Sequence, residues 1–266
     1  FGSADEWAFS PDGSALLFVA RVEPEGEPWS TNTDIYRVAT RGEPAPENLT
    51  ADNRASDTSP AWSPDGRRMA WLAMSRPGFE ADRYRIMLRD LADGGTREVA
   101  PAWDRSAHGL AFAPDGRSVF TWSDDLGHRR LFRVELRSGD AMPLSGDGSV
   151  AGFSVGPGVV VFARQNLAAP AQLFATSLRG RNERQLTSHN GALLGEIAFG
   201  AYEQFSFAGA GGETVYGWVV KPVGFQPGQR YPVAFIIHGG PQGSMGNSFH
   251  YRWNPQTYAG KGYAVV

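Results

Sequence analysis

The sequence of 266 residues contains no cysteine, which excludes disulfides, thiolate chemistry and cysteine-ligated zinc. This absence suits an oxidising compartment, so a periplasmic or secreted location is slightly favoured over a cytoplasmic one. No apolar run approaches the roughly 18 residues of a membrane-spanning helix, and no signal peptide is present. The formal net charge of −3 gives no electrostatic basis for binding nucleic acid or an anionic membrane, and we expect neither as a partner.

Fingerprints of bound cofactors are also missing. The chain has neither a P-loop nor a dinucleotide-binding glycine motif, because its glycine runs follow predicted hairpins rather than opening helices. None of the histidines is paired at the spacing of metal ligands. The five histidines are His108, His128, His189, His238 and His250. We therefore expect no cofactor and no metal.

Turn-forming residues are abundant instead. The chain has 33 glycines and 18 prolines, well above average usage of about 7% and about 5%. This richness favours many short strands joined by tight turns.

A repeated sequence motif also indicates short strands joined by tight turns. WAFSPDGSALLFVA (Trp7 to Ala20) recurs as AWSPDGRRMAWLA (Ala61 to Ala73) and AFAPDGRSVFTWS (Ala111 to Ser123), with a degenerate copy GFSVGPGVVVFAR (Gly152 to Arg164). Each copy reads strand, turn, strand, because proline sets the first turn φ, aspartate bonds its own backbone and glycine accepts a positive φ. A third and a fourth short alternating segment follow each copy.

Four short antiparallel strands per repeat are typical of a β-propeller blade. We therefore predict four blades over residues 1–200, and expect further blades before Phe1 since a closed ring has about four to eight. A ring closed by four blades is the less favoured alternative. The recurring aspartates at fixed spacing could suggest a calcium site, but we attribute each of them to the hydrogen bonding of its own turn. The recurring aromatics are expected to fill the space between neighbouring blades, and they are Phe9, Trp62, Phe112 and Phe153.

Two insertions interrupt the repeat, at residues 21–33 and 76–83. Loops on one rim of a propeller commonly bind partners. In the second insertion Glu80, Asp82 and Arg83 are candidates for contacting the charged end of a substrate. The alternative is a solvated rim loop with an internal ion pair, and it is favoured.

A second domain is predicted over residues 201–266. Residues 202–207 and 214–220 read as a hairpin, and 231–238 as a third strand whose apolar run indicates burial. Asn254 and Pro255 are typical of a helix start, and this helix is expected to end near Ala259 before a strand over 263–266. This order is how an α/β-hydrolase domain begins.

The third strand of this domain leads into His238-Gly239-Gly240-Pro241. An HGGG-type loop forms one half of the oxyanion hole in α/β-hydrolases, and this motif is a close variant. Glycines let a backbone approach a ligand with its N–H groups exposed. We therefore predict a site at this loop.

Together these features resemble the prolyl oligopeptidase family of serine peptidases. The resemblance rests on the Ser-Pro-Asp-Gly repeats running into HGGPQG, followed by RWNP (Arg252 to Pro255) and GYAVV (Gly262 to Val266). Within the family the chain looks most like the dipeptidyl peptidase 5 and acylaminoacyl peptidase type. The resemblance implies acyl transfer by a Ser-Asp-His triad on short peptides, with the Gly240 N–H donating to the oxyanion and His238 either lining the hole or packing against it. A homo-oligomer is left open.

The motif of the nucleophile is missing from this sequence. No G-x-S-x-G is present, and Gly243-Ser244-Met245-Gly246 lacks its spacing, so Ser244 is rejected as the nucleophile. We expect the chain to be part of a longer serine exopeptidase that releases N-terminal dipeptides, and to be inactive alone. The alternative is a non-catalytic propeller that binds a protein partner.

Overall fold

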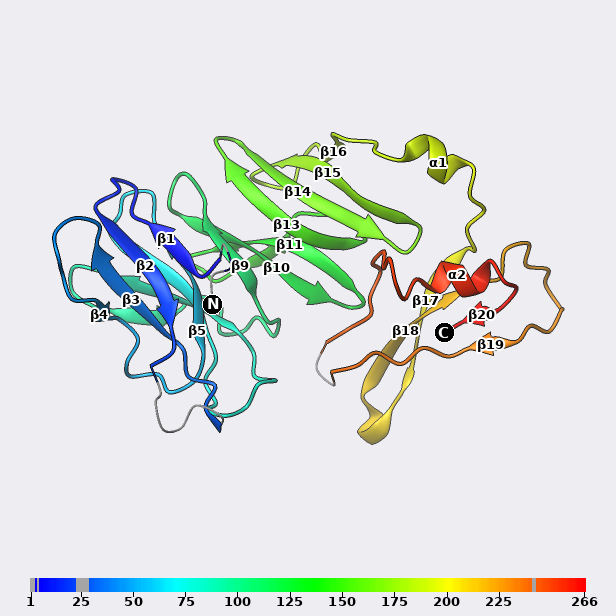
Figure 1. Ribbon diagram of the computed structural model, residues 1–266, viewed down its shortest axis with the longest axis horizontal. Coiled ribbons are helices and arrows are strands. Elements are labelled where there is room, and N and C mark those ends of the chain that lie inside the picture. The colour runs from blue at the N-terminus through cyan, green and yellow to red at the C-terminus, as the bar shows by residue number, and fades with distance from the viewer. Residues whose placement is uncertain (1–2, 4, 23–28, 241–242) are drawn as a thin grey trace. The chain divides into compact units, whose positions relative to one another are not determined.

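The computed structural model describes residue 3 and residues 5–22, 29–240 and 243–266 (Figure 1). The chain divides into two compact units. Unit 1 comprises Phe1–Ser123, Leu131–Leu144 and Ser154–Val159, and unit 2 comprises Asp124–Arg130, Ser145–Phe153 and Val160–Val266. The predicted boundary between residues 200 and 201 stays a prediction.

The predicted four-strand repeat is present. The first sheet contains β1 (Trp7–Phe9), β2 (Ala15–Ala20), β3 (Asp34–Ala39) and β4 (Glu47–Asn48). The second contains β5 (Asp57–Trp62), β6 (Arg68–Ala73), β7 (Arg85–Asp90) and β8 (Thr96–Glu98). In both sheets the strands pair antiparallel in chain order, so each sheet is a meander of the kind that forms a blade.

The third and fourth repeats share one sheet. Their strands are β9 (His108–Phe112), β10 (Ser118–Asp125), β11 (His128–Glu135), β12 (Ala141–Pro143), β13 (Ser149–Gly156), β14 (Val159–Asn166), β15 (Ala169–Ser177) and β16 (Arg184–Gln185). The two meanders are joined where β11 pairs parallel with β13, through Arg129 and Ser149. This junction was not predicted, because a single pair between strands from different repeats leaves no pattern in the sequence.

The Ser/Ala-Pro-Asp-Gly turns have the predicted chemistry. Their glycines take φ values of 71°, 71° and 65°, at Gly13, Gly66 and Gly116. Each aspartate accepts the backbone N–H two residues further on, at Asp12, Asp65 and Asp115. The explanation of these acids by their own turns is confirmed.

The core of unit 1 lies between neighbouring sheets. Leu17 and Ile35 of the first sheet pack with Met69 and Trp71 of the second, and a further cluster joins the second sheet to β9, β10 and β11. Trp62 packs against the former cluster.

The recurring aromatics do not all fill such space. Phe112 is buried in the core, but Phe9 is 55% exposed, so the expectation was wrong for Phe9. Phe9 pairs with Leu16 and therefore faces away from Leu17 and its cluster. Among the described residues no second sheet covers that face.

Unit 2 holds the C-terminal sheet, drawn yellow to red in Figure 1. Its strands, in sheet order, are β17 (Tyr202–Ala208), β18 (Thr214–Val220), β20 (Ala264–Val265) and β19 (Val233–Ala234). β17 and β18 form the predicted hairpin, with the 3₁₀ turn η2 (Ala210–Gly212) at its tip, and β19 runs parallel to β20. The helix α2 (Pro255–Ala259) begins as predicted, with the side chain of Asn254 accepting the Gln256 N–H. The assignment to an α/β-hydrolase domain stays a prediction.

The predicted buried strand over residues 231–238 is wrong in both length and burial. β19 has two residues, and Val233, Phe235 and Ile237 are 62%, 70% and 77% exposed. β19 is the edge strand, so its ladder extends only along β20. Alternate residues Ala234 and Ile236 pack inward, and the others face outward where no described layer covers them.

One short helix was missed by the sequence analysis. α1 (Gly191–Gly195) follows Asn190, which lies in the left-handed region with φ 60° and forms no side-chain cap. The segment buries no residue, so neither a cap nor an apolar face marks it in the sequence. Throughout the described ranges, no helix has the length and apolarity required to cross a membrane.

Candidate functional site

The glycine loop follows β19 directly, and its backbone is exposed. His238, Gly239 and Gly240 all face solvent, and Gly240 has φ 143°, a conformation that favours glycine. Among the described residues no acceptor takes the Gly240 N–H. Pro241 and Gln242 of the motif lie outside the described residues. The role of Gly240 as an oxyanion donor stays a prediction.

His238 is folded back on its own loop. Its Nδ1 lies 2.9 Å from the carbonyl oxygen of Gly239. A carbonyl only accepts, so Nδ1 is the donor in this hydrogen bond. The role of His238 as a lining residue stays a prediction.

Asp82, one of the three candidates in the second insertion, forms hydrogen bonds within its own loop. Asp82 Oδ2 accepts the backbone N–H of Ser75 at 2.7 Å, the Ser75 hydroxyl at 2.9 Å and the Arg76 N–H at 2.8 Å. Burial raises the pKa of Asp82, but these hydrogen bonds outweigh it and hold the pKa below its ordinary value. Asp82 is therefore an ionised residue that stabilises the loop.

The guanidinium of Arg83 is also paired. It donates to Glu98 Oε1 at 2.8 Å and to the Trp103 carbonyl at 2.7 Å. The ion pair therefore reaches out of the insertion to β8, rather than lying within the loop as the favoured alternative had it. Glu80 is exposed. Of the three candidates, its carboxylate is the one most accessible to a ligand.

The structure thus groups the predicted residues by loop. His238 and Gly240 lie together in unit 2, whereas Glu80, Asp82 and Arg83 lie together in unit 1. In the described part of the chain, no group of three or more histidines and carboxylates could hold a metal ion.

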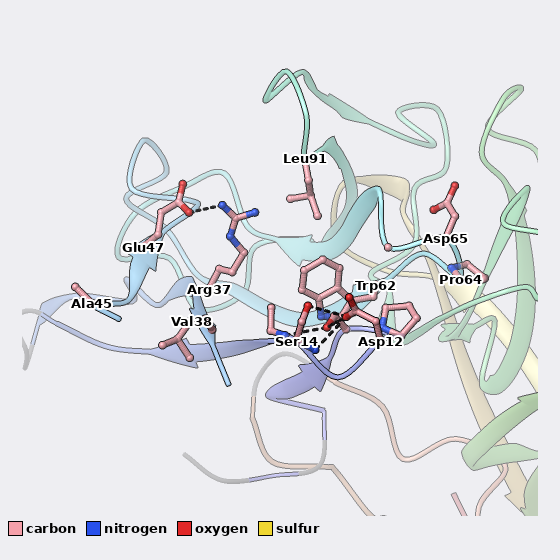
Figure 2. Close-up of a pocket in the computed structure, with 15 residues that line it drawn as sticks. Asp12, Ser14, Arg37, Val38, Ala45, Glu47, Trp62, Pro64, Asp65 and Leu91 are labelled. Carbon is pink, nitrogen blue, oxygen red and sulfur yellow. Dashed lines mark hydrogen bonds and ion pairs between the residues drawn. The ribbon is translucent and has the colours of Figure 1, made fainter. Parts of the chain in front are cut away.

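Unit 1 also contains a cavity of about 700 Å³ between its first two sheets, shown in Figure 2. Two of the repeated turns line it with Asp12 and Asp65, and Trp62 lies at its base. Hydrogen bonds from Ser10 and Ser14 lower the pKa of Asp12 to about 2. Arg37 of β3 pairs with Glu47 of the neighbouring strand β4 at 2.6 Å, and both residues line the cavity. No histidine lines the cavity, Asp12 and Asp65 belong to turns and Glu47 pairs with Arg37, so the cavity lacks a nucleophile–base pair.

Sequence reasoning missed Asn247, which lies just beyond the glycine loop and is 4% exposed. Its N–H donates to the Gly127 carbonyl at 2.8 Å, and its Oδ1 accepts the Leu167 N–H at 2.9 Å. These partners are distant in sequence, so no local motif could have identified them.

His128 lies next to this contact in unit 2. Its Nδ1 accepts the Gly148 N–H at 3.1 Å, and its ring meets Trp218 edge-on at 5.3 Å. Asp147 is 3.7 Å from Nε2. Burial lowers the pKa of His128, and the charge of Asp147 only partly opposes this. The neutral ring is therefore the form that fits here.

The chain is similar to known peptidases. It is 32% identical over 282 residues to the dipeptidyl-peptidase 5 of Trichophyton equinum, in a match that covers all of this chain and 39% of the relative. No family model matches the chain. The fold is similar to that of the Pyrococcus horikoshii acylaminoacyl peptidase, with a TM-score of 0.75 and 22% identity over 95% of this chain and 38% of that one. It is also similar to a puromycin-hydrolyzing peptidase of Mycobacterium tuberculosis, with a TM-score of 0.67 and 19% identity over 97% of this chain and 40% of that one.

Proposed function

Because the chain belongs to the prolyl oligopeptidase family and spans 39% of the length of the curated relative it matches, we propose that it is part of a serine exopeptidase. The proposed reaction releases N-terminal dipeptides from short peptides through an acyl-enzyme. Residues 1–200 are proposed as propeller blades, and residues 201–266 as the start of an α/β-hydrolase domain.

The observation that carries this proposal is the exposed glycine loop after β19. The Gly240 N–H is proposed to donate to the oxyanion of the tetrahedral intermediate. A preorganised donor of this kind stabilises charge that develops only in the transition state, and removing one typically lowers kcat by about 10² to 10³. The φ of 143° explains why glycine is needed here, since a side chain at this position would strain the backbone.

The nucleophile is proposed to lie outside these 266 residues. The sequence has no G-x-S-x-G, and Ser244 is exposed in a loop that no helix follows directly. A nucleophile elbow places its serine between a strand and a helix. We therefore propose that the chain by itself does not hydrolyse peptides, and that the complete protein supplies the Ser-Asp-His triad.

Selection of short peptides is proposed to involve Glu80. A dipeptidyl peptidase must recognise the α-ammonium group of its substrate, and an exposed carboxylate is a suitable partner for it. Asp82 and Arg83 would support this residue by stabilising its loop.

The test is made on the complete protein and on the 266-residue chain in parallel. The complete protein should react with a fluorophosphonate probe and release the reporter from a dipeptide anilide, and the chain should do neither. Alanine at Gly240 keeps the N–H but strains the backbone at φ 143° and displaces this donor, so Gly240→Ala in the complete protein should lower kcat about 10²-fold. A complete protein that does not react with the probe would contradict the peptidase proposal and favour a binding module.

A further inference from the structure

Asn247 is a buried polar residue at the C-terminal end of the glycine loop. In the sequence it lies six residues after the Pro241 that ends the His238-Gly239-Gly240-Pro241 motif. Exposed loops rarely end in a side chain that is 4% accessible. Burial of an amide is tolerated only when its polar atoms are paired, so the contacts of Asn247 must be made for this arrangement to persist.

The backbone of Asn247 is held by the turn between β10 and β11. Its N–H donates to the Gly127 carbonyl at 2.8 Å. The approach is close because Gly246 lacks a side chain: a Cβ on Gly246 would lie 2.5 Å from the same carbonyl oxygen. Gly127 itself has φ 79°, and a Cβ there would meet Gln204 and Trp218. The missing side chain of Gly246 therefore permits the contact, and Gly127 is a glycine because of its own positive φ and these two neighbours.

The side chain of Asn247 is held by a second turn, between β14 and β15. Its Oδ1 accepts the Leu167 N–H at 2.9 Å, so the segment between β19 and α2 reaches this turn (Figure 1). Leu167 is fixed in turn, since it packs in a buried cluster with Val220, Ala259 and Val265 of the C-terminal sheet and helix. The partner of Asn247 is therefore a rigid part of unit 2.

The other end of the glycine loop is anchored by β19. The Ile236 N–H donates to the Val266 carbonyl at 2.7 Å, and the Ala234 carbonyl accepts the Val266 N–H at 2.9 Å. Residues 237–240 therefore follow one fixed point, and residues 243–246 precede another. Fixing both ends of a segment limits the conformations that it samples.

We propose that Asn247 is a positioning residue for the glycine loop, which it ties to the turns at Gly127 and Leu167. This inference rests on the proposed function, because it assigns Asn247 the task of holding the oxyanion donor in place without touching the substrate. Loss of the Asn247 side chain removes the tie to Leu167 and leaves only the backbone hydrogen bond to Gly127 at this end of the loop. A catalytic group displaced by about 1 Å can lose about 10²-fold in rate.

The variants are Asn247→Ala, which removes the side-chain anchor, and Gly246→Ala, which forces the Gly127 carbonyl away and leaves the Asn247 side chain intact. The control is Asn53→Ala. Asn53 also accepts a backbone N–H, from Ala55, and donates to Asp57 and Met74, but it lies in unit 1. It therefore reports the general cost of losing a structural asparagine.

Kinetics of the complete protein on a dipeptide anilide form the first measurement. Both test variants should lower kcat about tenfold to a hundredfold with KM little changed, and Asn53→Ala should keep the wild-type kcat. Wild-type kcat in a folded Asn247→Ala protein, or an equal loss in Asn53→Ala, overturns the positioning role. A wild-type protein that turns over no dipeptide anilide contradicts the proposed function itself.

Hydrogen exchange is the second measurement, and it does not depend on activity. Asn247→Ala should speed amide exchange in peptides covering 243–250 and at Leu167, while exchange in β2, β3 and β6 stays at the wild-type rate. Unchanged exchange over 243–250 in this variant overturns the anchor. This readout separates a failed anchor from a failed peptidase assignment.

Discussion

The indole Nε1 of Trp71 donates to Asp57 Oδ1 at 2.6 Å inside the core of unit 1. Asp57 is 1% exposed, and its second oxygen accepts from Asn53 at 3.0 Å. Burial is the main cause that raises the pKa of Asp57 to about 7, with the charge of Asp34 adding to it and the two hydrogen bonds opposing it. A buried carboxyl group that titrates near neutrality makes stability depend on pH.

The first prediction concerns this dependence. Between about pH 4 and pH 7 the folded protein retains a proton on Asp57 that the unfolded chain has lost, so the contribution of Asp57 to stability falls as the pH rises through this window. The slope is at most about 1.4 kcal/mol per pH unit. Asp57→Asn should flatten it, as measured by urea unfolding at pH 5, 6 and 7. Equal slopes in the wild type and the variant would contradict the prediction.

The second prediction compares two aromatics of the repeat. Phe112 is 8% exposed in the core, whereas Phe9 is 55% exposed. Phe112→Ala should lower the free energy of unfolding by about 3 to 5 kcal/mol through lost burial and a cavity, and Phe9→Ala by less than about 1 kcal/mol. Urea titrations of the two variants make the comparison. A similar loss in both would show that Phe9 is covered in the protein as it exists in solution.

The third prediction concerns His128. Its Nδ1 accepts the Gly148 N–H, which only the unprotonated nitrogen can do. With a pKa held below its ordinary value of 6.5, His128 stays neutral in the folded protein while the unfolded chain binds a proton, so the contribution of His128 to stability is lost as the pH falls below 6.5. An NMR titration of the His128 ring, with the urea-unfolded protein as reference, measures this pKa. A folded-state pKa above that of the unfolded chain would refute it.

The fourth prediction separates two acids of the same loop. Asp82→Asn should destabilise the loop over 76–83 by about 1 kcal/mol, because the amide accepts the three Ser75 and Arg76 hydrogen bonds less strongly than a carboxylate. Glu80→Gln should leave stability unchanged and raise KM for peptides with a free N-terminus only. Hydrogen exchange and kinetics on free and blocked peptides provide the two readouts. An equal rise in KM for both kinds of peptide would remove Glu80 from α-ammonium recognition.

Local chemistry explains which parts of the fold were predictable. The Ser/Ala-Pro-Asp-Gly turns were predicted because each of the four residues has a local conformational role. Gly13 adopts a positive φ and Asp12 accepts a backbone N–H, as expected. The helix at Pro255 was predicted for the same reason, from a cap that the Asn254 side chain provides. Such features need no partner from elsewhere in the chain.

Other parts depended on partners that the sequence does not pair. The apolar run 233–238 was interpreted as buried, but burial depends on how many layers cover a strand, and β19 is an edge strand. In the candidate site, Gly240 could be identified from sequence because it belongs to a motif of four consecutive residues. Asn247 could not, because its partners Gly127 and Leu167 lie in turns that reach it only after folding.

The exposed edge strand has a practical consequence for anyone who purifies these 266 residues alone. One side of β19 offers backbone groups with no described partner, flanked by the outward-facing Val233, Phe235 and Ile237. Unpaired strand edges with apolar side chains are templates for pairing with another chain. The isolated polypeptide should therefore self-associate as its concentration rises, and a charged substitution such as Phe235→Lys should keep it dispersed.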